Sequence, residues 1–245
     1  IHAGGEDLIF PHHENEIAQS EAANGKEFSR YWMHNGFLNI DNRKMSKSLG
    51  NFFTVREISE KYDLQVLRFF MLSAHYRSPL NFSAELMEAA KSGLERIITA
   101  ADRLKFLMGS AKTEDMAETE AEKFAKSAEY VGNFESAMDD DFNTADAIAA
   151  VFDLVKFINT MTDEDSSKEY LENLFDRLVR LTEVLGIIVD KEDEILDSDI
   201  EALIAERQAA RKEKNFARAD EIRDELLAKG IVLKDTREGV QWKRA

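Results

Sequence analysis

Two residues near the start of the chain have the types and spacing of metal ligands. His12 and Glu16 are four residues apart and follow Pro11. On a helix this spacing places both side chains on one face, and an imidazole nitrogen with a carboxylate oxygen suits zinc. The two residues could therefore share a zinc ion. The alternative is a polar surface helix with solvated side chains, and two ligands alone favour that alternative.

A second candidate is the segment KMSKS at residues 44–48, which Gly50 follows. A loop of this composition can close over a triphosphate, with the ammonium groups of Lys44 and Lys47 opposing the negative charge that grows as pyrophosphate leaves. A solvated basic loop is the alternative, and the pentapeptide alone favours it.

A glycine-containing stretch follows His2. Gly4 and Gly5 permit close backbone approach to a planar ligand, and the acids Glu6 and Asp7 come next. Such an acid can bond ribose hydroxyls. Taken alone, such a Gly-Gly stretch is more often only a turn.

Helix and strand signals indicate how these residues are positioned. Pro11 suits the first turn of a helix that ends at Gly25. Two extended runs follow, with a turn at residues 35–36 or 41–42. We favour a strand that ends at Ile40, with a turn that presents residues 43–48 as a loop.

From Thr54 onward the periodicity is helical. Thr54 with Glu57 predicts a capping box, Asp63 can cap a very apolar helix, and Ser83 opens a helix of about seven turns. Further apolar stripes predict an antiparallel helical bundle; they lie at Phe124, Ala128 and Val131, at Ile148, Val151, Phe152, Val155 and Ile158, and at Leu171, Leu174, Phe175, Leu178, Leu181 and Leu185.

The last 45 residues have a different charge balance. Residues 201–245 carry eleven bases and nine acids, which is a net charge of +2. The whole chain has a net charge of −16, so the first 200 residues carry −18. The pattern predicts two helices and a hairpin around Gly239. A run of bases there could contact phosphates beside a stacking Trp242, or could pair with nearby glutamates; it comprises Arg207, Arg211, Lys212, Lys214 and Arg218.

Composition limits the classes of protein. The 245 residues contain no cysteine, so a disulfide framework or an all-cysteine zinc site is excluded. A net charge of −16 excludes a uniformly basic nucleic-acid binder. No apolar run approaches the ~18 residues of a membrane span, so we expect a cytoplasmic protein without membrane contact. The chain starts at Ile1, within what looks like a motif, which predicts a fragment.

Five motifs occur in order along the chain: PHHENEIAQSEA at residues 11–22, YWMH at 31–34, KMSKSLGN at 44–51, YDLQVLR at 62–68 and MDDDFNT at 138–144. With this order, the sequence closely resembles the cysteinyl-tRNA synthetase family, which belongs to the class I aminoacyl-tRNA synthetases. The resemblance covers essentially the whole chain. One departure is small: where the family commonly has His-Gly-Gly-Gly, residues 2–5 read His-Ala-Gly-Gly, which we expect to be tolerated.

The resemblance implies roles for particular residues. The family's zinc is held by two cysteines, a histidine and a glutamate, of which the last two match His12 and Glu16; the metal binds the thiolate of substrate cysteine. The segment Gly5, Glu6 and Asp7 matches positions that contact the adenylate. Lys47 matches a residue that contacts ATP, with Lys44 as its companion.

The resemblance also implies the architecture. We expect a mainly α protein with four parts: residues 1–53 as a remnant of the class I Rossmann catalytic domain with short strands, a helix and the KMSKS loop; 54–189 as a DALR-type, tRNA-binding antiparallel helical bundle; 190–200 as an acidic linker; and 201–245 as a small helix-plus-hairpin module that recognises the anticodon.

The leading hypothesis is the C-terminal half of a bacterial-type cysteine–tRNA ligase, a monomer that uses cysteine, ATP and tRNA-Cys. In the family, the HIGH signature and both zinc cysteines precede the point that matches Ile1, so we expect this chain alone to be inactive and to bind zinc poorly. One alternative is the cysteine ligase of mycothiol biosynthesis, which needs no anticodon module. The other is a non-catalytic acidic helical interaction module, which leaves the first 50 residues unexplained.

Overall fold

The computed structural model describes residues 1–41, 43–45, 53–189, 197–212, 215–229, 231–236 and 239–244. The chain forms two compact units, residues 1–190 and 191–245, and each is described here by itself. The predicted division of the first unit after residue 53 stays a prediction.

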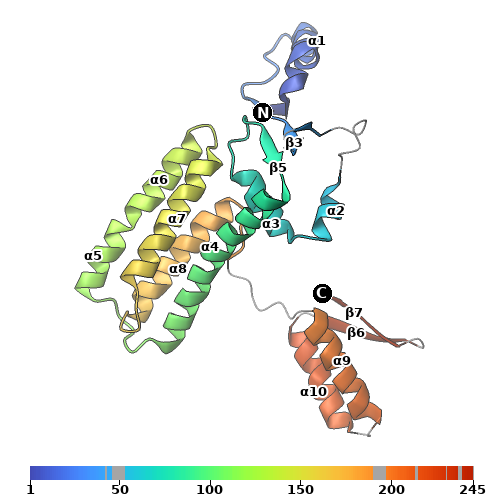
Figure 1. The fold of residues 1–245 in the computed structure, drawn as a ribbon, viewed down its shortest axis with the longest axis vertical. Helices are drawn as coiled ribbons and strands as arrows, with labels where there is room; N and C mark the ends of the chain where they lie inside the picture. Colours follow the sequence, from blue (N-terminus) through green and yellow to red (C-terminus); the bar gives the residue numbers. More distant parts are fainter. Residues whose placement is uncertain are drawn as a thin grey trace. The chain divides into compact units, whose positions relative to one another are not determined.

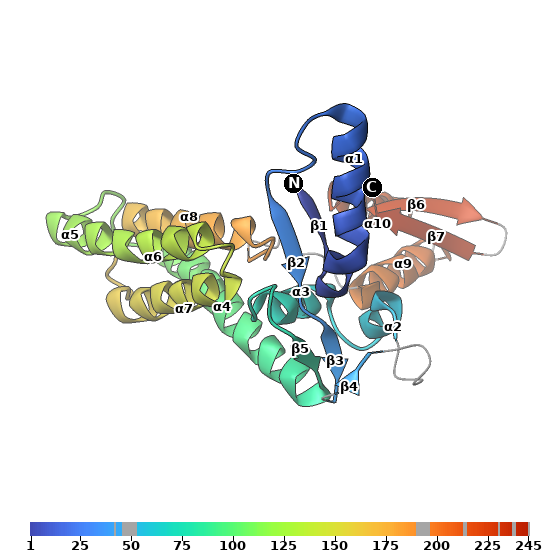
Figure 2. The ribbon, with the colours of Figure 1, turned by 90° about the horizontal axis from the view of Figure 1, so that it is seen from above.

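The first unit opens with a parallel β-α-β arrangement (Figure 2). Strand β1 (His2–Gly5) pairs in parallel with β2 (Trp32–Asn35), and the turns η1 (Glu6–Leu8) and η2 (Ile9–His13) and helix α1 (Glu14–Asn24) connect them. Gly25 ends α1 with a φ of 62°, in the left-handed region that favours glycine. The predicted end of this helix is confirmed, whereas α1 begins at Glu14, three residues after Pro11.

A second small sheet has the strand order β4-β3-β5, with β3 at Leu38–Ile40, β4 at Arg43–Lys44 and β5 at Leu80–Phe82. β3 and β4 are antiparallel, and Asp41 between them has a φ of 47°. The predicted end of a strand at Ile40 and the turn after it are confirmed. The prediction that residues 43–48 form a loop was wrong at Arg43 and Lys44, which pair with β3 as β4, and residues 46–48 lie outside the described residues. The structure adds β5, which pairs with β3 in parallel.

The predicted helix caps are present. Thr54 and Glu57 form a capping box at the start of α2 (Val55–Ser59), in which the Glu57 carboxylate accepts from the Thr54 backbone N at 2.6 Å. Asp63 caps α3 (Leu64–Leu72), and Ser83 caps the long helix α4 (Ala84–Ser110). Side-chain oxygens satisfy the free amide groups of these first turns, which fixes where each helix begins.

Helix α4 continues into a bundle with α5 (Glu118–Lys126), α6 (Ala128–Asp139), α7 (Thr144–Met161) and α8 (Lys168–Val184) (Figure 1). The predicted stripes form its core, in which Leu104, Leu154, Leu174 and Ile158 are completely buried. The expectation of a mainly α fold with an antiparallel bundle is confirmed. One detail was wrong: the stripe through Phe124 and Val131 lies on two helices, α5 and α6, separated at Ser127.

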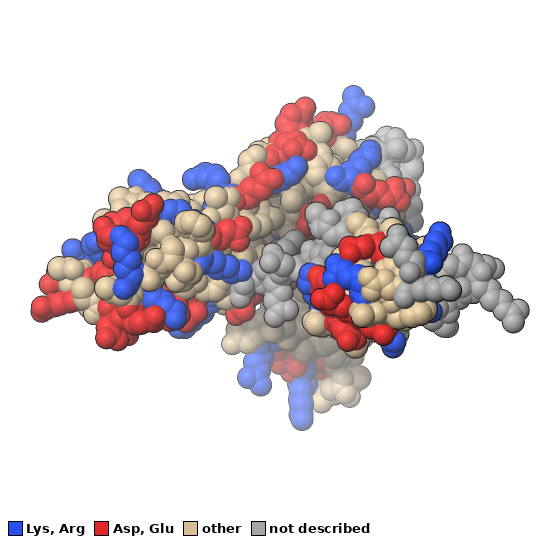
Figure 3. Space-filling model, turned by 90° about the horizontal axis from the view of Figure 1, so that it is seen from below, with Lys and Arg blue, Asp and Glu red and all other residues tan. Residues whose placement is uncertain are grey.

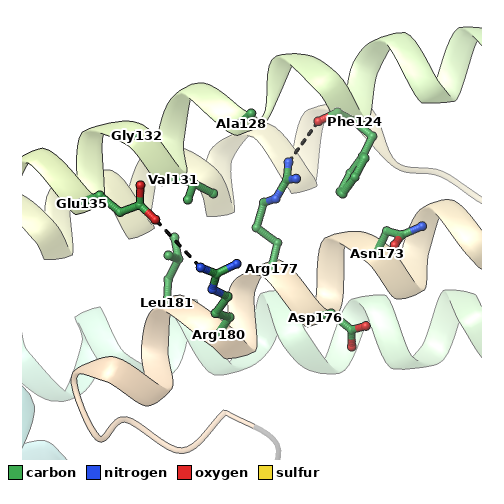
Figure 4. Close-up of a pocket in the computed structure, with 10 residues that line it drawn as sticks. All are labelled: Phe124, Ala128, Val131, Gly132, Glu135, Asn173, Asp176, Arg177, Arg180 and Leu181. Atoms are coloured by element: carbon green, nitrogen blue, oxygen red, sulfur yellow. Dashed lines mark hydrogen bonds and ion pairs between the residues drawn. The ribbon is translucent and has the colours of Figure 1, made fainter.

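Arg177 of α8 holds the junction between these two helices (Figure 4). Its Nη1 donates to the carbonyl of Phe124 at 3.0 Å and to the hydroxyl of Ser127, and its guanidinium lies 3.9 Å from the centre of the Phe124 ring. Arg177 and Phe124 line a groove of roughly 400 Å³ between α6 and α8. The carbonyl of Phe124, which also accepts from the backbone N and the hydroxyl of Ser127, thus gains a charged donor at the end of α5, and this donor stabilises the break there.

Glu120 joins the start of α5 to the start of α8. Its carboxylate accepts from the backbone N of Ser167 at 2.9 Å, from the Ser167 hydroxyl at 2.6 Å and from the backbone N of Ala117 at 3.0 Å. Burial alone would raise the pKa of this carboxyl, but the hydrogen bonds from Ser167 and Ala117 outweigh burial and lower the pKa below its ordinary value of 4.5. The ionised form is therefore favoured in the folded protein.

We predict that Glu120→Gln lowers the free energy of unfolding at pH 7 by about 1–3 kcal/mol, because the amide nitrogen of Gln faces donors and leaves one of them unpaired. Because the folded-state pKa is lowered, the wild-type contribution is complete above pH 4.5 and is lost as the pH falls through the folded-state pKa. Urea unfolding between pH 3 and 7 checks both effects. The exposed Glu122→Gln on the same helix is the control, and equal losses in the two variants would contradict the assignment.

The second unit consists of α9 (Asp197–Lys212), α10 (Phe216–Ala228) and an antiparallel hairpin of β6 (Ile231–Thr236) and β7 (Gly239–Arg244). A small core of Ile204, Ile222, Leu226 and Ile231 holds it together. The predicted pair of helices followed by a hairpin is confirmed.

None of the helices in the described part of the chain has the length and apolar character needed to cross a membrane.

Candidate functional site

A cluster of histidines lies where β1, η2 and β2 meet. The parallel pairing aligns His2 with Trp32 and Gly4 with His34, and η2 brings His13 beside them. The His2 and His13 rings are 4.8 Å apart, and the His13 and His34 rings are 5.0 Å apart. Residues from three separate elements therefore form one group.

His13 is buried, with 4 % of its surface exposed, and its Nδ1 lies 2.8 Å from Nε2 of His34. A hydrogen bond between two imidazole nitrogens needs one protonated and one free nitrogen. Burial, followed by the positive potential of His13 and Arg77, lowers the pKa of His34. The pair therefore favours a state in which His34 is neutral.

Glu16 reaches this cluster from α1. Its Oε2 lies 2.6 Å from Nε2 of His2, and the ligand atoms of His2, His13 and Glu16 all lie within 4.8 Å of one another. Imidazole and carboxylate are ligands that zinc accepts. The structure therefore brings predicted Glu16 to a group that could hold a metal, together with His2 and His13, which the sequence analysis did not select.

The predicted ligand His12 is exposed and lies outside that group. The i, i+4 spacing selects His12 only if the helix is regular from Pro11 onward, but the regular helix α1 begins at Glu14. The adjacent His13 is the residue that turns inward. Spacing alone could not distinguish the two neighbours.

Aromatic side chains surround the cluster. Trp32 stacks on His34 with ring centres 6.0 Å apart and planes 12° apart, and Phe28 lies 5.0 Å from His2. These rings remove water from one side of the histidines, which explains why burial dominates the pKa of His34.

The glycines predicted to allow close approach lie at the carboxyl end of β1. A Cβ on Gly4 would be 2.9 Å from Leu8 and 3.0 Å from His13, so the His13 ring occupies the space that any other residue would fill. Glu6 and Asp7 follow on η1 and are exposed. The carboxyl ends of parallel strands are where ligands bind in α/β sheets. Ala3 is exposed, which agrees with our expectation that its methyl group is tolerated.

The KMSKS segment is described only at its start. Lys44 lies in β4, where its backbone pairs with Asn39, and Met45 donates its backbone N–H to the carbonyl of Leu38 at 3.2 Å. Lys47 lies outside the described residues, so its predicted role is not tested by this geometry.

Among the basic residues of the second unit whose side chains the structure describes, at least two do not lie on a free face. Arg207 is buried, and Arg218 bonds the carboxylates of Glu206 and Glu221 at 2.9 and 2.8 Å. For Arg218 the alternative of pairing with glutamates is correct. The backbone of Trp242 pairs with Leu233 in the hairpin, and Lys214 lies outside the described residues.

Charge on the surface of the bundle is mixed. Figure 3 shows acidic and basic side chains interspersed over α5–α8 on the face that it presents. On that face, phosphate contacts of the bundle would depend on individual cations rather than on a continuous basic surface.

Three family models match the chain in succession: the class I (C) tRNA synthetase catalytic domain at residues 1–92, the DALR domain at 133–189 and the cysteinyl-tRNA ligase anticodon-binding domain at 193–242. Among solved structures, LeuRS of Agrobacterium radiobacter K84, in a ternary complex with tRNA and LeuAMS, shares the fold. Its TM-score is 0.61 at 19 % identity, and the match covers 78 % of this chain and 27 % of that one. The fold and the catalytic segment define a class I aminoacyl-tRNA synthetase.

Curated relatives specify the class further. Proteins named cysteine–tRNA ligase match all of this chain with 69 % identity in Lachnospira eligens, 57 % in Lachnoclostridium phytofermentans and 55 % in Clostridioides difficile. The chain belongs to the cysteinyl-tRNA synthetase family. It spans about half the length of these relatives, 52 % in the first and 53 % in the second.

Proposed function

We propose that these 245 residues are part of a cysteine–tRNA ligase that is as long as the curated relatives. We call that longer chain the full-length protein. It condenses cysteine with ATP to cysteinyl adenylate and pyrophosphate, then transfers the cysteinyl group to the terminal ribose of tRNA-Cys. The observation that carries the proposal is the succession of catalytic, DALR and cysteinyl anticodon-binding segments in one chain. We further propose that the protein is monomeric and acts in the cytoplasm.

The anticodon-binding match at residues 193–242 decides between this function and the alternatives. A ligase that joins cysteine to a small sugar has no use for an anticodon module. A non-catalytic helical module does not account for the catalytic-domain match at residues 1–92.

In this proposal the N-terminal residues act on the adenylate. The backbone at Gly5 and the acids Glu6 and Asp7 contact it at the carboxyl end of β1. Lys44 and Lys47 bind the ATP phosphates and stabilise the negative charge on the departing pyrophosphate. The bundle and the second unit bind the tRNA, and the second unit recognises the anticodon through unstacked bases.

The residues present are compatible with the family's zinc. Glu16 belongs to a group with His2 and His13 whose zinc-type donors lie within 4.8 Å of one another, and the exposed His12 lies outside that group. We propose that His12 and Glu16 hold the ion in the full-length protein, together with two cysteines that are not among these 245 residues. When bound, zinc supplies selectivity for a thiolate over a hydroxyl.

We predict that in the full-length protein His12→Ala weakens zinc binding by more than about 100-fold, because loss of a direct ligand costs more than the roughly 10- to 100-fold typical of an outer-shell partner. His13→Ala is the matched control, since it removes the neighbouring imidazole. Competition with a chelator measures both affinities. A larger loss in the His13 variant would instead assign the metal to the group of His2, His13 and Glu16.

Charging of tRNA-Cys tests the proposed function. The full-length protein is expected to attach labelled cysteine, but not serine, to a tRNA-Cys transcript in the presence of ATP. Charging of neither amino acid by a folded, zinc-loaded protein would overturn the proposal.

A further inference from the structure

The loop between α6 and α7 has an unusual backbone. Asp141 and Phe142 are consecutive non-glycine residues with φ values of 56° and 55°. Both are in the left-handed region, which is costly for residues with a side chain, and 53 % of the Phe142 surface is exposed. Burial of the Phe142 ring therefore does not account for the strain, and the MDDDFNT motif to which these residues belong has no role so far.

Asp141 uses this conformation to bind a segment about 65 residues away. Its Oδ1 accepts from the Tyr76 hydroxyl at 2.7 Å, and its Oδ2 accepts from Nε of Arg77. His75 stacks on Tyr76 with ring centres 4.9 Å apart, and Nε2 of His75 lies 3.9 Å from Oδ2 of Asp141. One carboxylate of the bundle thus holds the connection between α3 and β5.

That connection is also fixed to the strands of the catalytic segment. The backbone N of Gly36 donates to the carbonyl of Tyr76 at 2.8 Å, and the backbone N of Leu80 donates to the carbonyl of Phe37 at 2.9 Å. A Cβ on Gly36 would lie 2.6 Å from the backbone of Ser78, so the two chains are in close contact there. β5 then pairs with β3.

β3 and β5 contact the chain at the start of the KMSKS segment and again after its end. On one side, β3 pairs with β4, which contains Lys44. On the other side, the Phe53 ring lies 5.0 Å from the Phe82 ring of β5. A continuous series of hydrogen bonds and ring contacts therefore joins Asp141 to the backbone of Lys44.

We propose that Asp141 is a positioning residue, which fixes the backbone of Lys44 from the helical bundle through Tyr76, Arg77 and β5. The proposal rests on the proposed function for its effect on catalysis, because Lys44 acts there on the ATP phosphates. Its structural part, the fixing of β3, β4 and β5, stands independently of any activity.

The structural part is tested with these 245 residues. Hydrogen exchange is measured for the backbone amides of Met45 and Leu80, which bond to Leu38 and Phe37. In Asp141→Asn, both amides are expected to exchange at least fivefold faster, while amides of the buried α4 core keep their rates, because loss of charge weakens the bond from Arg77. Asp140→Asn, an exposed neighbour that removes the same charge, is the control.

The catalytic part is tested in the full-length protein by cysteine-dependent exchange of pyrophosphate into ATP. Asp141→Asn is expected to raise KM for ATP about fivefold with KM for cysteine unchanged, and Asp140→Asn to stay within twofold of wild type. Equal rises in the KM values for ATP and cysteine, or a fall in kcat with both KM values unchanged as expected from loss of folded protein, would contradict the proposal. Unchanged hydrogen exchange and unchanged KM for ATP would also overturn it.

Two further results keep the tests distinct. If Asp141→Asn does not fold, Tyr76→Phe removes only the 2.7 Å hydrogen bond and is expected to show the same changes at about half the size. If the wild-type full-length protein does not exchange pyrophosphate into ATP, the proposed function fails. The hydrogen-exchange comparison on the 245 residues then still supports or overturns the role of Asp141.

Discussion

Replacing Lys47 by Ala in the full-length protein is expected to lower kcat for cysteine-dependent pyrophosphate exchange by about 100-fold, the size typical for loss of one group that stabilises developing charge. The first 200 residues have a net charge of −18, so a polyanion such as ATP meets a repulsive background. Attraction of the ATP phosphates must therefore come from cations close to the site. Because we propose that Lys47 binds phosphate and not the amino acid, KM for cysteine should stay unchanged.

The matched control for this variant is Lys91→Ala, which removes an exposed lysine of α4. It should retain exchange activity within twofold of wild type. A loss of less than threefold in Lys47→Ala would show that the KMSKS lysine does not stabilise the departing pyrophosphate.

Leu104→Ala is expected to have the largest effect on stability, a loss of about 2–5 kcal/mol in the free energy of unfolding, because it leaves a cavity in the bundle core. Leu104 is completely buried on α4, where the apolar stripe meets the other helices. Leu86 lies on the same helix with 43 % of its surface exposed, so Leu86→Ala should cost only about 1 kcal/mol.

Urea unfolding followed by far-UV circular dichroism compares the two leucine variants on these 245 residues. Equal shifts of the two unfolding midpoints would mean that the stripe is not the stabilising core of the bundle.

Helix boundaries and the bundle were predictable because their causes are local. Thr54, Asp63 and Ser83 each satisfy amides of their own first turn, and a stripe of Leu and Ile at helical spacing must be buried somewhere. The break at Ser127 was not predictable, because it is stabilised by Arg177, a residue 50 positions away that donates to the carbonyl of Phe124 and to the hydroxyl of Ser127.

The histidine cluster could not be predicted from local spacing. His12 and Glu16 were selected because they are four residues apart, and their role as metal ligands stays a prediction; the cluster itself contains His13, which is buried at the end of the turn Ile9–His13. His2 joins the group only through the pairing of β1 with β2, and short strands of three or four residues leave a weak pattern. The contact of Asp141 with Tyr76 is likewise a long-range one that no local pattern contains.

We propose that these 245 residues are about half of an enzyme that activates cysteine. Cysteine-dependent exchange of pyrophosphate into ATP is therefore measured for the full-length protein and for residues 1–245 alone, under the same zinc-loaded conditions. We expect robust exchange with cysteine and none with serine for the full-length protein, and no exchange for the 245 residues alone. Exchange by the 245 residues alone, or none by the folded full-length protein, would contradict the proposal.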